Sequence, residues 1–222
     1  MSTILLTGFE AFGSTPINPA EQVALRLDGK EIAGGKVVSR VIPNTFYKCI
    51  DVVVEAIEQL KPQAVVMMGE CGGRSMITVE RIAQNLNDCA RYGVEDNDGN
   101  ILQDKMTIEG GPAAYYSTLP LRAMVQTMRT EGVPADISDA AGTFCCNHLM
   151  YGVLHYISEN KLNIRAGWIH LPHLPVVAAL EENLGAPSMS TKIAARGVRA
   201  GISAICSHAE DVEVNIPSRL QI

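Results

Sequence analysis

Two adjacent cysteines stand where an extended segment gives way to a helix. Residues 136–139 have buried-strand character, small residues form a turn after them, and a helical pattern begins at Cys145 and Cys146. The first N–H groups of a helix lack backbone partners and carry partial positive charge, which favours a thiolate over a thiol. Extending the apolar face of this helix backwards reaches Cys146 rather than Cys145. The pattern therefore indicates Cys146 as a cysteine nucleophile, although an inert core cysteine would explain it equally well.

A cysteine nucleophile needs a base, and the chain has five histidines. Three of them lie within or at the end of predicted helices: His148, His155 and His208. His170 follows the predicted strand 165–169, and His173 comes three residues later in the same loop. A strand end is better fixed than a loop between two prolines, so His170 is the favoured base and His173 its rival.

The third part of such a site is a carboxylate that orients the imidazole. Glu80 lies in residues 76–86, which alternate between apolar and polar side chains like a strand. The pattern alone favours a solvated glutamate paired with Arg74 or Arg81 over a catalytic one. Both interpretations of Glu80 stay open at this point.

The glycine-rich loop at residues 69–75 suggests a second kind of chemistry. Glycines let backbone N–H groups approach an anion, which would suit a phosphorylase or nucleosidase. The loop lacks the glycine and lysine spacing of known phosphate-binding motifs, and a strand-like segment rather than a helix follows it. A non-catalytic binding domain with an unreactive Cys146 is the third alternative.

Metal chemistry is not predicted. Cysteine and histidine cluster in two places, at residues 145–148 and 170–173, but neither has the paired spacing of a zinc site.

The composition is that of a globular chain of 222 residues with 47% hydrophobic and 19% charged residues. A net charge of -6 without a basic cluster gives no reason to expect nucleic acid, and no apolar run suits a membrane span or a signal peptide. Six scattered cysteines in a chain with a large core do not indicate disulfides. We therefore expect a cytoplasmic protein.

Strands and helices alternate along the chain. The predicted strands are residues 4–7, 37–42, 64–68, 133–138 and 165–169, and the predicted helices include residues 46–60, 119–130, 145–159 and 190–208. Residues 101–118 are expected to form an irregular excursion, a flap or contact hairpin. This alternation predicts a single three-layer α/β/α domain over residues 1–222, with an open, twisted, mostly parallel sheet and ligands at the carboxyl ends of the strands.

Four motifs together resemble the pyrrolidone-carboxylate peptidases, also called pyroglutamyl peptidase I. They are LLTGFEAFG followed by NPA, VERIAQN around Glu80, AGTFCCN around Cys146 and GWIHLP around His170. The resemblance implies that these three residues form a Glu-Cys-His triad. It also implies a cytosolic enzyme, often a tetramer, that needs no metal or cofactor and releases N-terminal pyroglutamate from small peptides through a thioester.

The same resemblance implies a pocket for the lactam ring of pyroglutamate. Its residues would be Phe9, Phe12, Thr45, Glu70, Arg91, Phe144 and Cys145, with Glu70 and Cys145 contributing through their backbone. Bacterial members of the family usually have glutamine at the position of Glu70. Because a carboxylate beside a neutral lactam is costly unless it is paired or turned away, we expect Arg74 to be the partner of Glu70 if it is paired.

Overall fold

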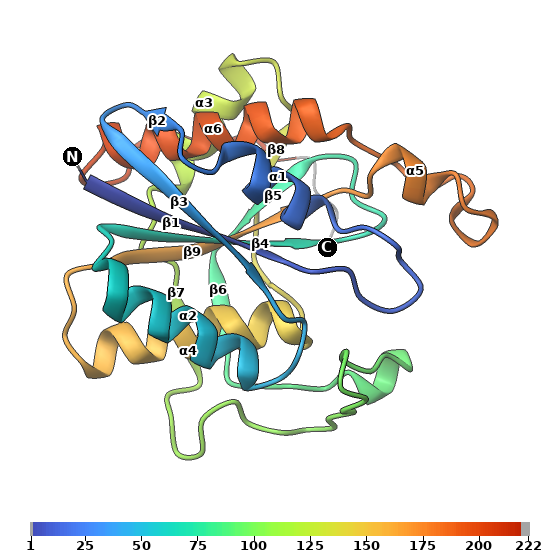
Figure 1. Ribbon diagram of the computed structural model, residues 1–222. Coiled ribbons are helices and arrows are strands. Elements are labelled where there is room, and N and C mark those ends of the chain that lie inside the picture. The colour runs from blue at the N-terminus through green and yellow to red at the C-terminus, as the bar shows by residue number, and fades with distance from the viewer. Residues whose placement is uncertain (1, 219–222) are drawn as a thin grey trace.

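The structure, a computed structural model that describes residues 2–218, is built around a seven-stranded sheet (Figure 1). The strand order is β2-β3-β1-β4-β9-β5-β8. In chain order the strands are β1 (Ser2–Phe9), β2 (Glu31–Ile32), β3 (Gly35–Ile42), β4 (Ala64–Glu70), β5 (Ile77–Glu80), β8 (Ala135–Ser138) and β9 (Arg165–Leu171). Neighbouring strands are parallel except at β2–β3 and β5–β9, so the sheet is mostly parallel, as predicted.

Helices cover both faces of this sheet. The α6 face carries α1 (Pro19–Leu27), α3 (Leu121–Thr130) and α6 (Thr191–Ser207), and the α4 face carries α2 (Lys48–Leu60) and α4 (Cys145–Glu159) (Figure 1). Strand side chains alternate between two cores: in β4, Val66 and Met68 pack on the α6 face, and Val65 and Met67 on the α4 face. The predicted three-layer sandwich is confirmed.

The predicted single strand at residues 76–86 is wrong, because the chain changes partners at Arg81. The Arg81 N–H still donates to the carbonyl of Ser138 in the main sheet, whereas its own carbonyl accepts from the N–H of Ser117. The chain then continues as β6 (Ile82–Gln84), which pairs with β7 (Ala114–Tyr116) in a separate two-stranded sheet. Glu80 is thus the last residue of a strand in the main sheet.

The predicted irregular excursion is held against the α4 side of the molecule. Asn85 Oδ1 accepts from the N–H groups of Thr107 (2.8 Å) and Ile108 (3.0 Å), and its amide nitrogen donates to the carbonyl of Ile108. Tyr151 of α4 donates to the carbonyl of Pro112 at 2.7 Å. The remaining short elements, which the sequence analysis did not predict, are η1 (Ala90–Tyr92), α5 (Pro175–Ala178) and η2 (Glu181–Asn183).

His148 is a buried side chain of α4 that forms hydrogen bonds with two loops. Its Nε2 accepts from the N–H of Tyr47 at 2.9 Å, so the proton of the neutral ring lies on Nδ1. That nitrogen is 3.2 Å from both Asn87 Oδ1 and Thr107 Oγ1. Burial of the ring lowers the pKa of His148 to about 4. The histidine therefore stays neutral in the folded protein where an unfolded chain would protonate it.

This difference predicts a loss of stability in acid. Because the unfolded state binds a proton below pH 6.5 and the folded state does so only near pH 4, the free energy of unfolding falls as the pH drops through this window. Between pH 7.5 and pH 5 the His148 contribution is about 2 kcal/mol. In denaturant titrations at these two pH values, the free energy of unfolding should decrease by about 2 kcal/mol less in His148→Gln than in the wild type. His155→Gln, on the same helix with a partly exposed ring, is the control, and equal losses in wild type and His148→Gln would contradict the prediction.

Candidate active site

The two cysteines occupy the first turn of α4 but have different surroundings. Phe144 is the extended residue before the helix, Cys145 is fully buried, and Cys146 keeps partial exposure. Asn147 fixes this turn to β6: its Oδ1 accepts from the N–H of Gln84 at 2.9 Å, and its amide nitrogen donates to the carbonyls of Gln84 and Leu86. Cys146 is therefore a partly exposed residue at a firmly held helix start.

Gly69 of β4 brings Cys146 close to the sheet. A Cβ atom at Gly69 would lie 2.9 Å from Cys146 Sγ and 2.7 Å from Cζ2 of Trp168, closer than real side chains approach. In the parallel register Gly69 is paired with His170, so the side chain of His170 points to the α4 face as well. A glycine at this position makes the room in which the thiol can approach the strand that carries His170.

Glu80 and His170 form a buried hydrogen-bonded pair. His170 Nδ1 lies 2.7 Å from Glu80 Oε1, and the two side chains are 4% and 0% exposed. The register of β5 against β9 sets Thr78 opposite His170 and Glu80 opposite Trp168, so all four side chains point to the α4 face. An ionised carboxylate only accepts hydrogen bonds, so Nδ1 carries the proton and Nε2 is the free, basic nitrogen. The interpretation of Glu80 as a solvated glutamate is wrong.

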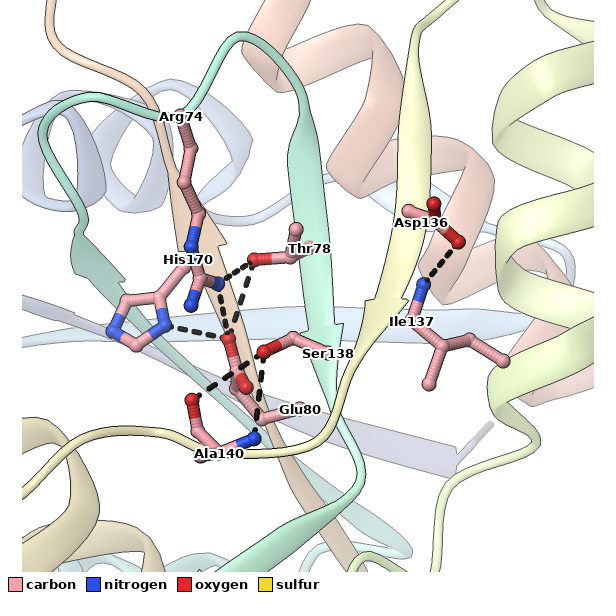
Figure 2. Close-up of polar contacts among 8 residues, drawn as sticks. All are labelled: Arg74, Thr78, Glu80, Asp136, Ile137, Ser138, Ala140 and His170. Atoms are coloured by element: carbon pink, nitrogen blue, oxygen red, sulfur yellow. Dashed lines mark hydrogen bonds and ion pairs between the residues drawn. The ribbon is translucent and has the colours of Figure 1, made fainter. Parts of the chain in front are cut away.

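Two further side chains contact the same carboxylate. Figure 2 shows Arg74 and Thr78 meeting Glu80 beside His170: Arg74 Nη1 is 2.7 Å and Thr78 Oγ1 is 3.2 Å from Oε1. Burial by itself would raise the pKa of Glu80, but the hydrogen bond and charge of His170 and the charge of Arg74 hold it below its usual value. Glu80 is thus an anion despite its burial.

The thiol of Cys146 differs from the sequence expectation. Burial, reinforced by the nearby Cys71 and Glu80, raises the pKa of Cys146 well above its usual value, and the opposing charge of Arg74 is not enough to reverse this. The prediction that the helix start would favour a thiolate is therefore wrong for the resting site, because loss of water opposes ionisation of the thiol. A neutral Cys146 has to give up its proton to a base before it can attack.

The rival histidine belongs to a second carboxylate pair on the other side of β4. His173 Nδ1 lies 2.8 Å from Glu70 Oε1, and burial raises the pKa of Glu70. Glu70 follows Gly69 in the strand, so alternation points its side chain away from Cys146. The predicted pairing of Glu70 with Arg74 is wrong. Arg74 pairs with Glu80 instead, and the partner of Glu70 is His173.

The predicted pocket residues are only partly brought together. Phe12 contacts Phe144 with ring centres 5.9 Å apart, and Phe46, which the sequence analysis did not predict, contacts Phe144 at 5.5 Å. Phe9 is buried against Trp168 at 5.5 Å. Within residues 2–218 the ring contacts thus form two groups, one around Phe144 at the start of α4 and one between Phe9 and Trp168.

The other pocket candidates lie in three settings. Thr45 is buried just before α2, and its carbonyl accepts from the N–H of Cys49. Cys145 is buried, so it can offer a substrate only its backbone. Arg91 is exposed and covers the ring of Tyr92 at 5.2 Å, and within residues 2–218 no hydrogen bond or ion pair ties it to the other predicted residues.

Thr78, Arg74 and Trp168 are parts of the site whose roles the sequence analysis missed. Thr78 precedes Glu80 by two residues and Trp168 precedes His170 by two. The strand period of two would have placed both on the catalytic face. The pairing of Glu80 with Arg74 was one of the two named for a solvated glutamate, and it is confirmed, but the pattern gave Arg74 no place in the site.

Other chemistries find little support in this part of the molecule. Arg74, the cation of the glycine-rich loop, is paired with Glu80, which leaves a phosphate without its charge partner. Within residues 2–218 no three histidine, cysteine or acidic side chains are placed to hold a metal ion. Nor do these residues contain a helix with the length and apolar character needed to cross a bilayer.

The chain is similar in sequence to known proteins. A family model described as pyroglutamyl peptidase matches residues 2–208. The chain is 57% identical to the pyrrolidone-carboxylate peptidase of Mycobacterium tuberculosis over the full length of both chains, and 43% identical to that of Bacillus mycoides over 97% of this chain and 96% of the relative.

Solved structures give the same result. The crystal structure of pyroglutamyl peptidase I from Bacillus amyloliquefaciens superposes with a TM-score of 0.91 at 36% identity, covering 96% of this chain and all of that one. Pyrrolidone carboxyl peptidase from Thermococcus litoralis gives a TM-score of 0.91 at 34% identity, covering 97% of this chain and all of that one. A family match over most of the length, joined to similarity of this extent, shows that the chain belongs to the pyroglutamyl peptidase family.

Proposed function

We propose that this protein is a cysteine peptidase that removes the N-terminal pyroglutamyl residue from small peptides. The roles we assign are nucleophile for Cys146, base for His170 and orienting carboxylate for Glu80. The observation that carries the proposal is the buried Glu80–His170 hydrogen bond on the sheet face against which Cys146 packs. A thiol, an imidazole with a free Nε2 and a carboxylate behind it are the parts of a thiol peptidase.

The first half of the reaction forms a thioester. His170 Nε2 takes the proton of Cys146, and Glu80 stabilises the resulting imidazolium. The thiolate attacks the pyroglutamyl carbonyl carbon, and N–H groups at the start of α4 receive the oxyanion. Cys146 and His170 are not hydrogen-bonded to each other in the described structure; such contacts commonly tighten when substrate binds.

The second half returns the enzyme. The imidazolium of His170 gives its proton to the departing amine as the peptide bond breaks. Water, deprotonated by His170, then attacks the thioester carbonyl, and the sulfur leaves to recover its proton. Pyroglutamate and the shortened peptide are the products.

Selectivity in this proposal comes from an apolar slot with backbone partners. Phe9, Phe12 and Phe144 would surround the lactam ring near Thr45, and the backbone of Glu70 and Cys145 would hydrogen-bond its N–H and C=O. Because the lactam is neutral, such a slot needs no charged side chain, which agrees with Glu70 being turned away and paired with His173. Arg91 would have to leave Tyr92 to reach a substrate.

The experiment that tests the function compares three arylamides. We expect hydrolysis of the pyroglutamyl compound and at least about 100-fold lower kcat/KM for the prolyl and glutamyl analogues, since one lacks the lactam oxygen and the other adds charge. Comparable hydrolysis of the prolyl compound would contradict the lactam slot. No hydrolysis of any of the three would contradict the proposed function.

We further propose that residues 1–222 work as one peptidase domain, in the cytoplasm, without a metal or cofactor, and as a homotetramer. The resemblance to the family supports this, and the exposed apolar side chains of Val176 (56%) and Leu184 (71%) suit a contact between subunits. Sedimentation velocity measures the assembly directly.

A further inference from the structure

One oxygen of Glu80 serves three donors. Oε1 lies 2.7 Å from both His170 Nδ1 and Arg74 Nη1, and 3.2 Å from Thr78 Oγ1. The other oxygen, Oε2, is buried and has no hydrogen-bond partner within residues 2–218. The direction in which this carboxylate points is therefore fixed at one atom, by the donors that converge there.

Of these three donors, Arg74 alone does not lie in β5 or β9. Figure 2 shows it descending from the loop that precedes β5, whereas Thr78 and Glu80 lie in β5 and His170 in β9. Its side chain is 22% exposed, and Nη1 donates to both Glu80 Oε1 and Thr78 Oγ1. The guanidinium ties the loop to the strand at the point where Glu80 meets His170.

We propose that Arg74 is a positioning residue of the catalytic centre, which aims Glu80 at His170 and limits how strongly Glu80 holds a proton on the imidazole. The inference rests on the proposed function, because it concerns the base of that reaction. Arg74 would then affect the reaction as well as the stability of the ion pair with Glu80.

The aiming follows from the geometry of the guanidinium. A carboxylate held at one oxygen can rotate about its last side-chain bond, and each donor lost from Oε1 weakens its orientation. Arginine supplies a planar set of N–H donors, which bridges Thr78 and Glu80 with one nitrogen. Without it, the buried anion would keep His170, the weaker contact of Thr78 and the influence of the Ser138 hydroxyl, but no cation from the loop.

Arg74 limits the proton affinity of His170 because both side chains interact with the same negative charge, that of Glu80. Arg74 and His170 are each 2.7 Å from the same oxygen, so a protonated His170 would feel both the attraction of Glu80 and the repulsion of Arg74. Removal of Arg74 leaves the whole charge of Glu80 to His170. The imidazolium is then more stable, and His170 becomes available as a base only at higher pH.

Other titratable groups face the pair but do not change in this comparison. Cys71 lies on the same loop as Arg74, and Cys146 starts α4; both interact electrostatically with Glu80 and Arg74. Glu70 and His173 satisfy each other on the opposite face of β4.

The test compares Arg74→Met and Arg74→Lys with a matched control. Arg81→Met removes an arginine next to Glu80 in sequence, but that arginine is 47% exposed and paired with the exposed Asp139. The first readout is the pH profile of kcat and kcat/KM on the pyroglutamyl-arylamide. The second is the NMR titration of the His170 ring, which does not depend on activity.

For Arg74→Met we expect kcat to fall by about 10- to 100-fold with KM little changed, as for the loss of other groups that orient a catalytic residue. The acid limb of kcat/KM and the His170 titration should both move up by about 0.5 to 1 pH unit. Arg74→Lys keeps the charge but not the planar fork, so kcat should fall several-fold while the acid limb stays in place. Arg81→Met should match the wild type.

A folded Arg74→Met variant with the wild-type acid limb and His170 titration would overturn the proposal. If that variant does not fold, Arg74→Lys decides, because a wild-type kcat there would show that the fork is not needed. A wild-type protein inactive on the arylamide would contradict the proposed function instead, and the His170 titration would still decide the role of Arg74.

Discussion

Replacing Cys146 with serine is expected to lower kcat/KM for a pyroglutamyl-arylamide by about 1,000-fold or more. A serine hydroxyl is a far weaker nucleophile than a thiol, and the site gives it no additional activation. Even the thiol is difficult for the base to deprotonate, since burial raises the pKa of Cys146. His170 then has to remove a proton from an alcohol whose pKa is higher still, so the variant should bind substrate and turn it over very slowly.

The neighbouring cysteine supplies the control. Cys145→Ala changes a fully buried side chain in the same helical turn, so it should cost about 1 to 2 kcal/mol of stability and leave kcat nearly unchanged. Alkylation with iodoacetamide, followed by mass spectrometry, should place the modification that abolishes activity on Cys146. A fully active Cys146→Ser, or inactivation that follows the labelling of Cys145, would show that the nucleophile has been assigned to the wrong cysteine.

The sequence predicted those parts of the site that depend on local pattern. The helix start at the cysteines and the end of the strand at His170 follow from periodicity, turn residues and apolar runs within about ten residues of each position. The choice of Cys146 over Cys145 as nucleophile stays a prediction; in the structure it is the sulfur of Cys146 that lies close to Gly69. These features needed no knowledge of the strand order.

The partners of the carboxylates could not be predicted in this way. Glu70 is only four residues from Arg74, and proximity in sequence suggested that they would pair. In the structure β9 lies between β4 and β5 and runs antiparallel to β5, which sets Glu80 beside His170. The loop after β4 then crosses to β5, and Arg74 goes with it. Strand order, which the alternating pattern does not encode, decided both pairs.

The protonation state of Cys146 could not be predicted for a related reason. The partial positive charge of a helix start stabilises a thiolate most simply when the sulfur is in contact with water, and the sequence does not show whether it is. In the structure Gly69 and Trp168 close over the sulfur from the sheet side, and Glu80 adds a negative charge nearby. Burial is a property of the packed molecule, and in this site it raises the pKa of the thiol.

Glu80→Gln is the second substitution for which we expect a large effect, with kcat lowered by about 100- to 10,000-fold. The amide oxygen can still accept from Arg74 and His170 at the position of Oε1, so the arrangement of side chains should survive. What is lost is the negative charge, and with it the stabilisation of the imidazolium that forms when His170 takes the proton of Cys146. The imidazolium is therefore less stable, and the acid limb of kcat/KM should move to lower pH, opposite to the shift expected for Arg74→Met.

Asp136→Asn is the control that separates this effect from the loss of a buried carboxylate in general. Asp136 lies in β8, its side chain is 2% exposed, and it is 3.4 Å from Arg129, but within residues 2–218 it has no hydrogen bond or ion pair with a histidine (Figure 2). Its replacement should cost about 1 to 3 kcal/mol of stability and leave kcat and the pH profile close to wild type. If Glu80→Gln likewise lost only stability, with unchanged kcat in the folded fraction, the negative charge of Glu80 would have no part in making His170 a base. If instead only Glu80→Gln shifts the acid limb, the negative charge behind His170 is what makes it a base strong enough for a buried thiol.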